Sequence, residues 1–115
     1  MKRFAIVMAF SLVSFHAVAA TPDCTGTNRW PVMMALTHLK NASLITNETI
    51  DHAATKVVRL ASEESANGLF RQIHLITFIT KAGSTFQVVT ANDASSVECS
   101  MSEVTVYVIS KQIGG

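Results

Sequence analysis

The spacing of apolar residues changes once along this chain, near Thr55, from a helical period to the two-residue period of β-strands. Before that point, apolar residues recur at the three- and four-residue intervals of one helix face: Val32, Ala35, Leu36 and Leu39. This pattern predicts an amphipathic helix over residues 31 to about 42. Thr27 or Asn28 can cap its first turn, and Pro31 suits its start.

After Thr55 the sequence predicts four strands, because alternating runs rich in β-branched and aromatic residues are separated by turn-forming residues. The runs cover residues 55–61, 69–80, 85–91 and 103–110. The second run is apolar on both faces, which is typical of a central strand. Residues 47–54 are expected to form either a short helical turn or an ordered loop. This order predicts an α+β fold in which an N-terminal helix packs on a roughly four-stranded antiparallel meander sheet.

The first 20 residues have the pattern of a cleavable secretory signal peptide. Lys2 and Arg3 precede an apolar run that ends near Val13, and the small residues that follow allow cleavage after Ala19 or Ala20. The run is shorter than the roughly 20 residues that cross a bilayer, so an integral membrane protein is not expected. We therefore predict a single domain over residues 21–115, located in the bacterial periplasm or secreted.

Cys24 and Cys99 both lie in the part predicted to be exported. In an oxidising compartment, an even pair of cysteines in a small domain predicts a disulfide, and nothing resembling Cys-x-x-Cys favours a redox or metal site. The bond would join the start of the helix to the loop before the last strand. It would stabilise the fold by about 4–5 kcal/mol in the chain-entropy model.

Removal of the signal peptide also changes the charge. Without Lys2 and Arg3, seven Lys and Arg remain against eight Asp and Glu, so the net charge becomes −1 instead of the +1 of the full chain. No cluster of Lys and Arg is left, and nucleic acid is therefore excluded as an expected partner.

The sequence carries little that predicts chemistry. The spacing of His38, His52 and His74 matches no metal-ligand pattern, and the serines lack a G-x-S-x-G elbow. We therefore predict a protein that is not an enzyme and that needs no cofactor. Copper binding by Met33, Met34 and His38 remains an alternative, because thioether and imidazole groups are good copper ligands.

Two polar segments, residues 62–68 and 92–102, are long for such a small domain, and rigid scaffolds that present loops are suited to binding proteins. The sequence therefore predicts an immunity or inhibitor protein that neutralises another protein, such as a toxin or an enzyme. The alternatives are a periplasmic carrier of metal or small molecules, and an accessory subunit of an envelope assembly that pairs through an edge strand at 55–61 or 103–110. For Trp30, closing the end of the core beside Cys24 is the favoured role over partner contact, because a small domain seldom leaves its only tryptophan exposed. The expected partner-binding residues are Trp30, Glu63, Glu64, Asn67, Asn92, Asp93 and Tyr107.

Overall fold

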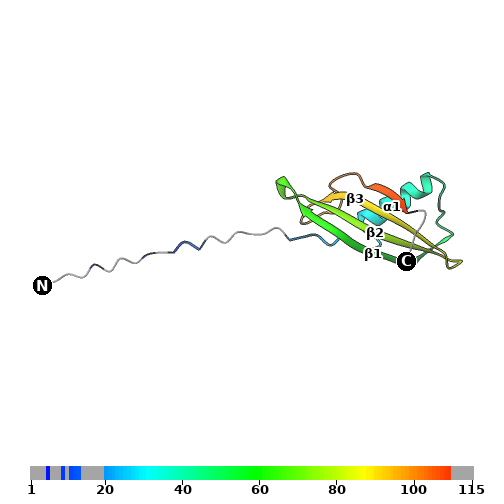
Figure 1. Ribbon diagram of the computed structural model, residues 1–115, viewed down its shortest axis with the longest axis horizontal. Helices are drawn as coiled ribbons and strands as arrows, with labels where there is room; N and C mark the ends of the chain where they lie inside the picture. Colours follow the sequence, from blue (N-terminus) through cyan, green and yellow to red (C-terminus); the bar gives the residue numbers. More distant parts are fainter. Residues whose placement is uncertain (1–4, 6–8, 10, 14–19, 110–115) are drawn as a thin grey trace.

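One α-helix followed by a four-stranded antiparallel sheet forms the structure, which is a computed structural model (Figure 1). Residues 5, 9, 11–13 and 20–109 are described, so most of the predicted signal peptide and Ser110 of the last predicted strand lie outside the described residues. The elements are α1 (Trp30–Asn41), β1 (Ile50–Glu64), β2 (Phe70–Thr80), β3 (Thr85–Ala94) and β4 (Thr105–Ile109). Each strand pairs with the next in the order β1-β2-β3-β4, and the predicted α+β meander is confirmed.

Helix α1 begins without a side-chain cap, and the predicted capping role of Thr27 or Asn28 is wrong. Arg29 occupies the cap position in an extended conformation, because a tight turn returns its N–H to the carbonyl of Gly26 at 3.0 Å. Pro31 lies in the first helical turn and has no N–H to satisfy, which reduces the need for a cap. The helix was otherwise predicted to within one residue at each end.

Two strands are longer than the sequence predicted. β1 starts at Ile50, which pairs with Thr80, and the register shifts between Asp51 and Lys56. This shift accommodates residues with weak strand preference, so residues 47–54 are neither a helical turn nor wholly a loop. β3 continues to Ala94, because its last residues pair with β2 as far as Phe70. The predicted loop 92–102 therefore starts three residues too early.

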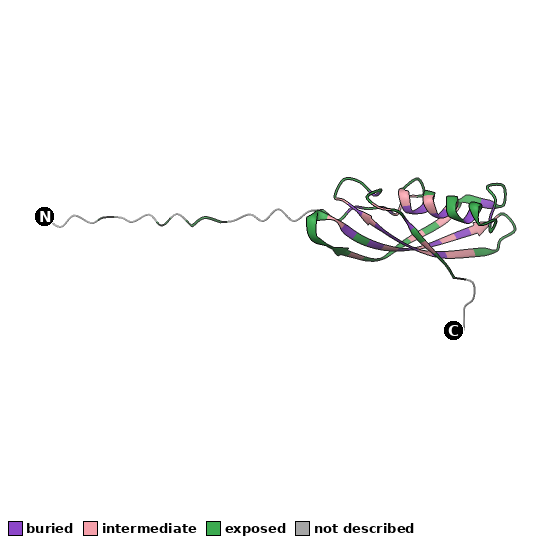
Figure 2. Cartoon of the chain, turned by 90° about the horizontal axis from the view of Figure 1, so that it is seen from above, coloured by how far each residue is buried: buried purple, intermediate pink, exposed green. Residues whose placement is uncertain are grey.

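The helix packs on one face of the sheet, which we call the inner face, while the opposite, outer face is not covered by any described element (Figure 2). The main apolar core lies between α1 and the inner face. It consists of Val32, Ala35, Leu39, Ile45, Ile50, Ile76, Phe78 and Val88. The burial alternates along β2, so Phe70, Ile76 and Phe78 point inward.

A second, smaller cluster surrounds the disulfide between Cys24 and Cys99, which confirms the predicted pairing. Ala94 is buried in this cluster, and the ring of Trp30 packs against it. The Trp30 indole Nε1–H donates a hydrogen bond to the carbonyl of Ser102 at 3.0 Å. Trp30 therefore closes this end of the interior.

No helix in the described part of the chain has the length and apolar character needed to cross a membrane.

Candidate functional site

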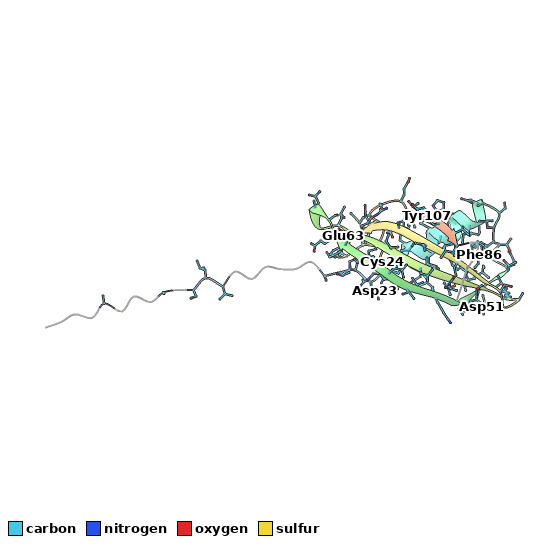
Figure 3. The ribbon with its side chains drawn as sticks, viewed as in Figure 1. Asp23, Cys24, Asp51, Glu63, Phe86 and Tyr107 are labelled. Carbon is cyan, nitrogen blue, oxygen red and sulfur yellow. A yellow bond between two sulfur atoms is a disulfide. The ribbon has the colours of Figure 1, made fainter. Side chains whose placement is uncertain are left out.

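Three segments that are far apart in the sequence meet at one end of the sheet, which we call the disulfide end. They are residues 21–25, the β1–β2 turn at 65–69 and the β3–β4 connection at 95–104. The register places the turn at the same end as the connection, because Glu64 pairs with Phe70, and Phe70 pairs with Ala94 at the end of β3. The disulfide between Cys24 and Cys99 attaches residues 21–25 to the connection. Asp23, Cys24 and Glu63 lie toward this end, while Asp51 and Phe86 lie toward the opposite one (Figure 3).

The N-terminal segment at the disulfide end is held by covalent and polar contacts. The disulfide joins Cys24 to Cys99, with their Cα atoms 5.8 Å apart. The carbonyl oxygen of Pro22 accepts hydrogen bonds from Gln72 Nε2 at 3.1 Å and from Arg59 Nη1 at 3.3 Å. Pro22 itself is buried. Residues 22–24 are therefore an integral part of the fold.

Asp23 lies between these fixed points, and its carboxylate faces solvent. Its Oδ1 accepts hydrogen bonds from the Thr25 hydroxyl at 2.6 Å and from the Thr25 N–H at 3.0 Å. The hydroxyl bond first, then the N–H bond, lower the pKa of Asp23 below its ordinary value. The positive charges of Arg59 and Arg29 act in the same direction. Asp23 is therefore a fixed negative charge at this end.

The β3–β4 connection is also held by hydrogen bonds. The hydroxyl oxygen of Ser95 accepts bonds from the N–H groups of Val97 at 3.3 Å and Glu98 at 3.0 Å. Asn92 Nδ2 donates to the carbonyl of Cys99 at 2.8 Å. At the tip of this ordered connection, the side chain of Val97 is 92% exposed. Val97 is therefore the most exposed apolar side chain of this connection.

The β1–β2 turn has a backbone that few residues adopt. Asn67 and Gly68 both have a φ of 70°, in the left-handed region that asparagine and glycine tolerate best. The turn is closed by a hydrogen bond of 2.7 Å from the N–H of Ser65 to the carbonyl of Leu69. Asn67 and Gly68 therefore fix the backbone shape that this turn presents to solvent.

Several residues predicted to bind a partner are exposed at the disulfide end: Glu63, Glu64 and Asn67. Asp93 is partly buried beside them, and its Oδ1 lies 3.3 Å from Nη1 of Arg71. Asn92 belongs to β3 and is completely buried, so it supports Cys99 from inside and cannot contact a partner directly.

Of the other two predicted residues, Trp30 packs against the disulfide cluster, and Tyr107 lies elsewhere. Tyr107 is in the middle of β4 and is 59% exposed on the outer face. The register aligns it with three apolar residues across the sheet, Val89, Leu75 and Val58. Sequence reasoning missed this row, because its members come from four strands whose register was unknown. It also missed Val97, which lies in a segment that is otherwise polar.

Polar residues interrupt the inner face between the two apolar clusters. His74 is paired with Thr90 and Gln72 with Asn92, and all four side chains are completely buried. Neither nitrogen of the His74 ring has a hydrogen-bond partner among the described protein atoms. Burial first, and then the charge of Arg59, lower the pKa of His74, while Asp23 opposes them. The fold therefore favours the neutral form of the His74 imidazole.

This burial predicts an acid-sensitive fold. Because the pKa of His74 is lower in the folded than in the unfolded chain, the unfolded chain binds more protons below the ordinary pKa of 6.5. The free energy of unfolding should therefore fall as the pH drops below about 6.5, by at most about 1.4 kcal/mol per pH unit, and should change little from this cause above pH 7. Urea denaturation at several pH values measures this slope. His74→Leu should reduce it, whereas His52→Leu, at an exposed position of β1, should not; an unchanged slope in His74→Leu contradicts the prediction.

The candidate copper ligands are only partly brought together. Met34 and His38, one helical turn apart, line a cavity of about 200 Å³ together with Trp30 and Glu103. Met33 does not line this cavity and is 51% exposed. Among the residues that the structure describes, no three His, Cys, Asp or Glu side chains gather as metal ligands. Of the three candidate copper ligands, the Met34 thioether and the His38 imidazole therefore line one cavity, and the Met33 thioether does not.

No family model matches the chain, and neither does any curated protein or solved structure. Only the arrangement of this chain's own residues therefore indicates its function. Its most distinctive arrangement is the convergence of three constrained segments at the disulfide end.

Proposed function

We propose that this protein is an exported, non-enzymatic binding domain that docks its disulfide end onto another protein and neutralises it, as an inhibitor or immunity protein does. The observation that carries the proposal is the convergence of residues 21–25, 65–69 and 95–104 at that end. The predicted signal peptide and the disulfide support a periplasmic or secreted location.

The rigidity of the disulfide end favours tight binding. Association costs free energy when loops must be ordered, and a preformed surface avoids most of that cost. Here the disulfide, the Pro22 carbonyl bonds and the Ser95 bonds hold the segments before any partner arrives. The segments can therefore act as one preformed surface.

The exposed chemistry of this end indicates what kind of surface it fits. Val97 offers an apolar contact at the tip of the β3–β4 connection. The same end carries the exposed carboxylates of Asp23, Glu63, Glu64 and Glu98, which outnumber its exposed guanidinium groups, those of Arg29, Arg59 and Arg71. Charge complementarity between partners raises the rate of association and selects among partners. We expect a partner with a basic rim around a shallow apolar site.

A non-enzymatic role fits the placement of the titratable groups. Both described cavities lie between α1 and β4, and the titratable residues lining them are His38 and Glu103. His74, whose pKa is shifted, is completely buried and has no access to a substrate. General acid–base catalysis requires a group within hydrogen-bond reach of a bound substrate, and the buried His74 ring does not meet this requirement.

Photo-crosslinking tests where the partner binds. A crosslinking amino acid is placed at Val97 or at Asn67, and as a matched control at Ala82, in the exposed β2–β3 turn at the opposite end. Each protein is mixed with envelope and secreted proteins of the source bacterium. The same protein should be captured from Val97 and Asn67 and not from Ala82. Adding the unlabelled binding domain in equal amount should abolish the activity of the captured protein.

Two results would overturn the proposal. One is the absence of a common captured protein from the two positions at the disulfide end. The other is equal capture from Ala82, which would mean that contact is not specific to this end. If the captured protein were instead chemically altered and released, the domain would be an enzyme.

A further inference from the structure

The two edges of the sheet differ in how they are protected from pairing with another strand. β1 is irregular, because its register shifts twice, and it carries charged residues, among them Lys56 and Arg59. Bulges and charges are the usual devices that keep an edge strand from pairing. β4 pairs with β3 in an unbroken register, and residues 104–109 carry no charge. β4 is therefore the unprotected edge.

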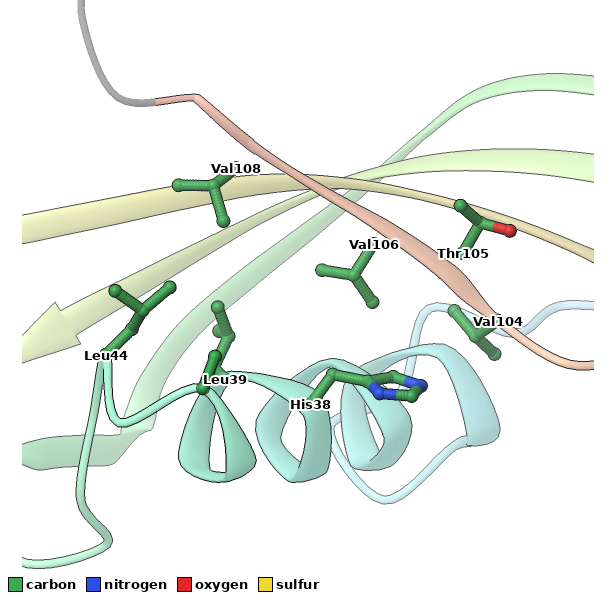
Figure 4. A pocket seen from close by; sticks show the side chains of 8 residues that line it. His38, Leu39, Leu44, Val104, Thr105, Val106 and Val108 are labelled. Atoms are coloured by element: carbon green, nitrogen blue, oxygen red, sulfur yellow. The ribbon is translucent and has the colours of Figure 1, made fainter.

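An apolar groove runs beside this edge, between α1 and β4 (Figure 4). We call it the α1/β4 groove. Its larger part, about 350 Å³, is lined by His38, Leu39 and Leu44 on one side and by Val106 and Val108 on the other. The cavity of about 200 Å³ beside Met34 extends it, since His38, Val104 and Thr105 line both. A strand added to β4 would place its inward side chains in this groove.

We propose that β4 pairs antiparallel with β4 of a second copy of this chain, so that the two sheets become continuous and each copy fills the α1/β4 groove of the other. The strand that fits the groove must be uncharged and must place apolar side chains inward at every second position. β4 meets this requirement itself, with Val106 and Val108 facing inward and lining the groove. Leu44 is 51% exposed at the rim of the α1/β4 groove, where it can cover Val106 and Val108 of the second copy.

Symmetry favours a second copy over an unrelated strand. A two-fold axis through the edge at Val106 places Val104 of each copy opposite Val108 of the other, and the facing residues from 104 to 108 are all uncharged, while Ile109 faces Glu103. The same contact protects both open edges at once. Only the two β1 edges then remain, and their bulges and charges stop further growth. The expected product is a closed dimer and not a fibre.

This inference is independent of the proposed function. In the antiparallel dimer, the disulfide ends point in opposite directions, because β4 starts near the disulfide end and runs away from it. Both ends stay free, so the dimer would present two docking surfaces.

The first experiment measures the mass of the exported protein by sedimentation velocity from about 1 μM to about 1 mM, where weak interfaces assemble. We expect a monomer–dimer equilibrium. Val108→Lys should weaken the dimer about 100-fold or more, because it buries an ammonium group in the groove. Val58→Lys, the same change at an exposed position of β1, should leave it unchanged. A wild type that is monomeric throughout, or equal weakening by both variants, overturns the inference.

Amide hydrogen exchange of the wild-type protein gives a second test that needs no variant. Alternate N–H groups of β4 point away from β3, and in the dimer they bond to the second copy. Their exchange should slow as the concentration rises. If a dimer forms but these amides stay unprotected, the copies meet through another surface, such as the outer face at Tyr107, and the inference is wrong. If the Val108→Lys variant no longer dimerises but still crosslinks to the partner protein from position 97, dimerisation and partner binding are independent properties.

Discussion

Replacing Cys24 and Cys99 together with alanine is expected to lower the free energy of unfolding by about 4.5 kcal/mol, the chain-entropy value for the 75-residue separation between them. The effect is large because both sulfur atoms belong to the smaller of the two apolar clusters, where the bond holds residues 21–25 against the β3–β4 connection. Native domains have only about 5–15 kcal/mol of total stability. Equilibrium urea denaturation at neutral pH measures the loss.

The wild-type protein treated with reductant is the matched control. Reduction should destabilise it by a similar amount, while the double variant should not respond to reductant at all. A double variant within about 1 kcal/mol of the oxidised wild type would contradict the prediction and would mean that the polar contacts of Pro22 hold the segment unaided.

The second large effect is expected at the opposite end of the sheet. Phe78→Ala should lower the free energy of unfolding by about 3–5 kcal/mol, because the ring is completely buried among α1, β2 and β3 and its removal leaves a cavity. Phe86 faces Phe78 across β2 and β3 and is only partly buried. Phe86→Ala is therefore a matched control of the same chemistry, and it should cost roughly half as much. Thermal and urea denaturation of the two variants give the comparison. Equal losses would show that the core is not centred on Phe78.

Much of the fold was predictable because the signals were local. The helical spacing of Val32, Ala35 and Leu39 and the alternation along residues 69–80 each depend on neighbouring residues alone. The disulfide was predictable for a different reason, since a chain with two cysteines in the part predicted to be exported has only one pairing to make. These features specified the helix, the order of the strands and the bond that ties them.

The parts that sequence did not predict depend on contacts between distant residues. Asn92 has little preference for strands, yet its pairing with Gln72 and its bond to Cys99 hold it in β3. Arg29 replaced the expected caps because Gly26 allows a tight turn before α1. The two polar segments and the disulfide were predicted separately, but their meeting at one end of the sheet and the exposure of Val97 there required the three-dimensional arrangement.

The order of the strands in the sheet equals their order along the chain, and this has a consequence for how the protein folds. Every pairing from β1 to β4 closes a loop between sequence neighbours, which is the kinetically fast kind of contact. The contact that spans most of the domain is the one between residues 24 and 99. We therefore expect the sheet to form first and its thiols to be oxidised afterwards, within a chain that is already largely native. An oxidising enzyme acting on this protein would meet two cysteines that the folded strands have already brought together.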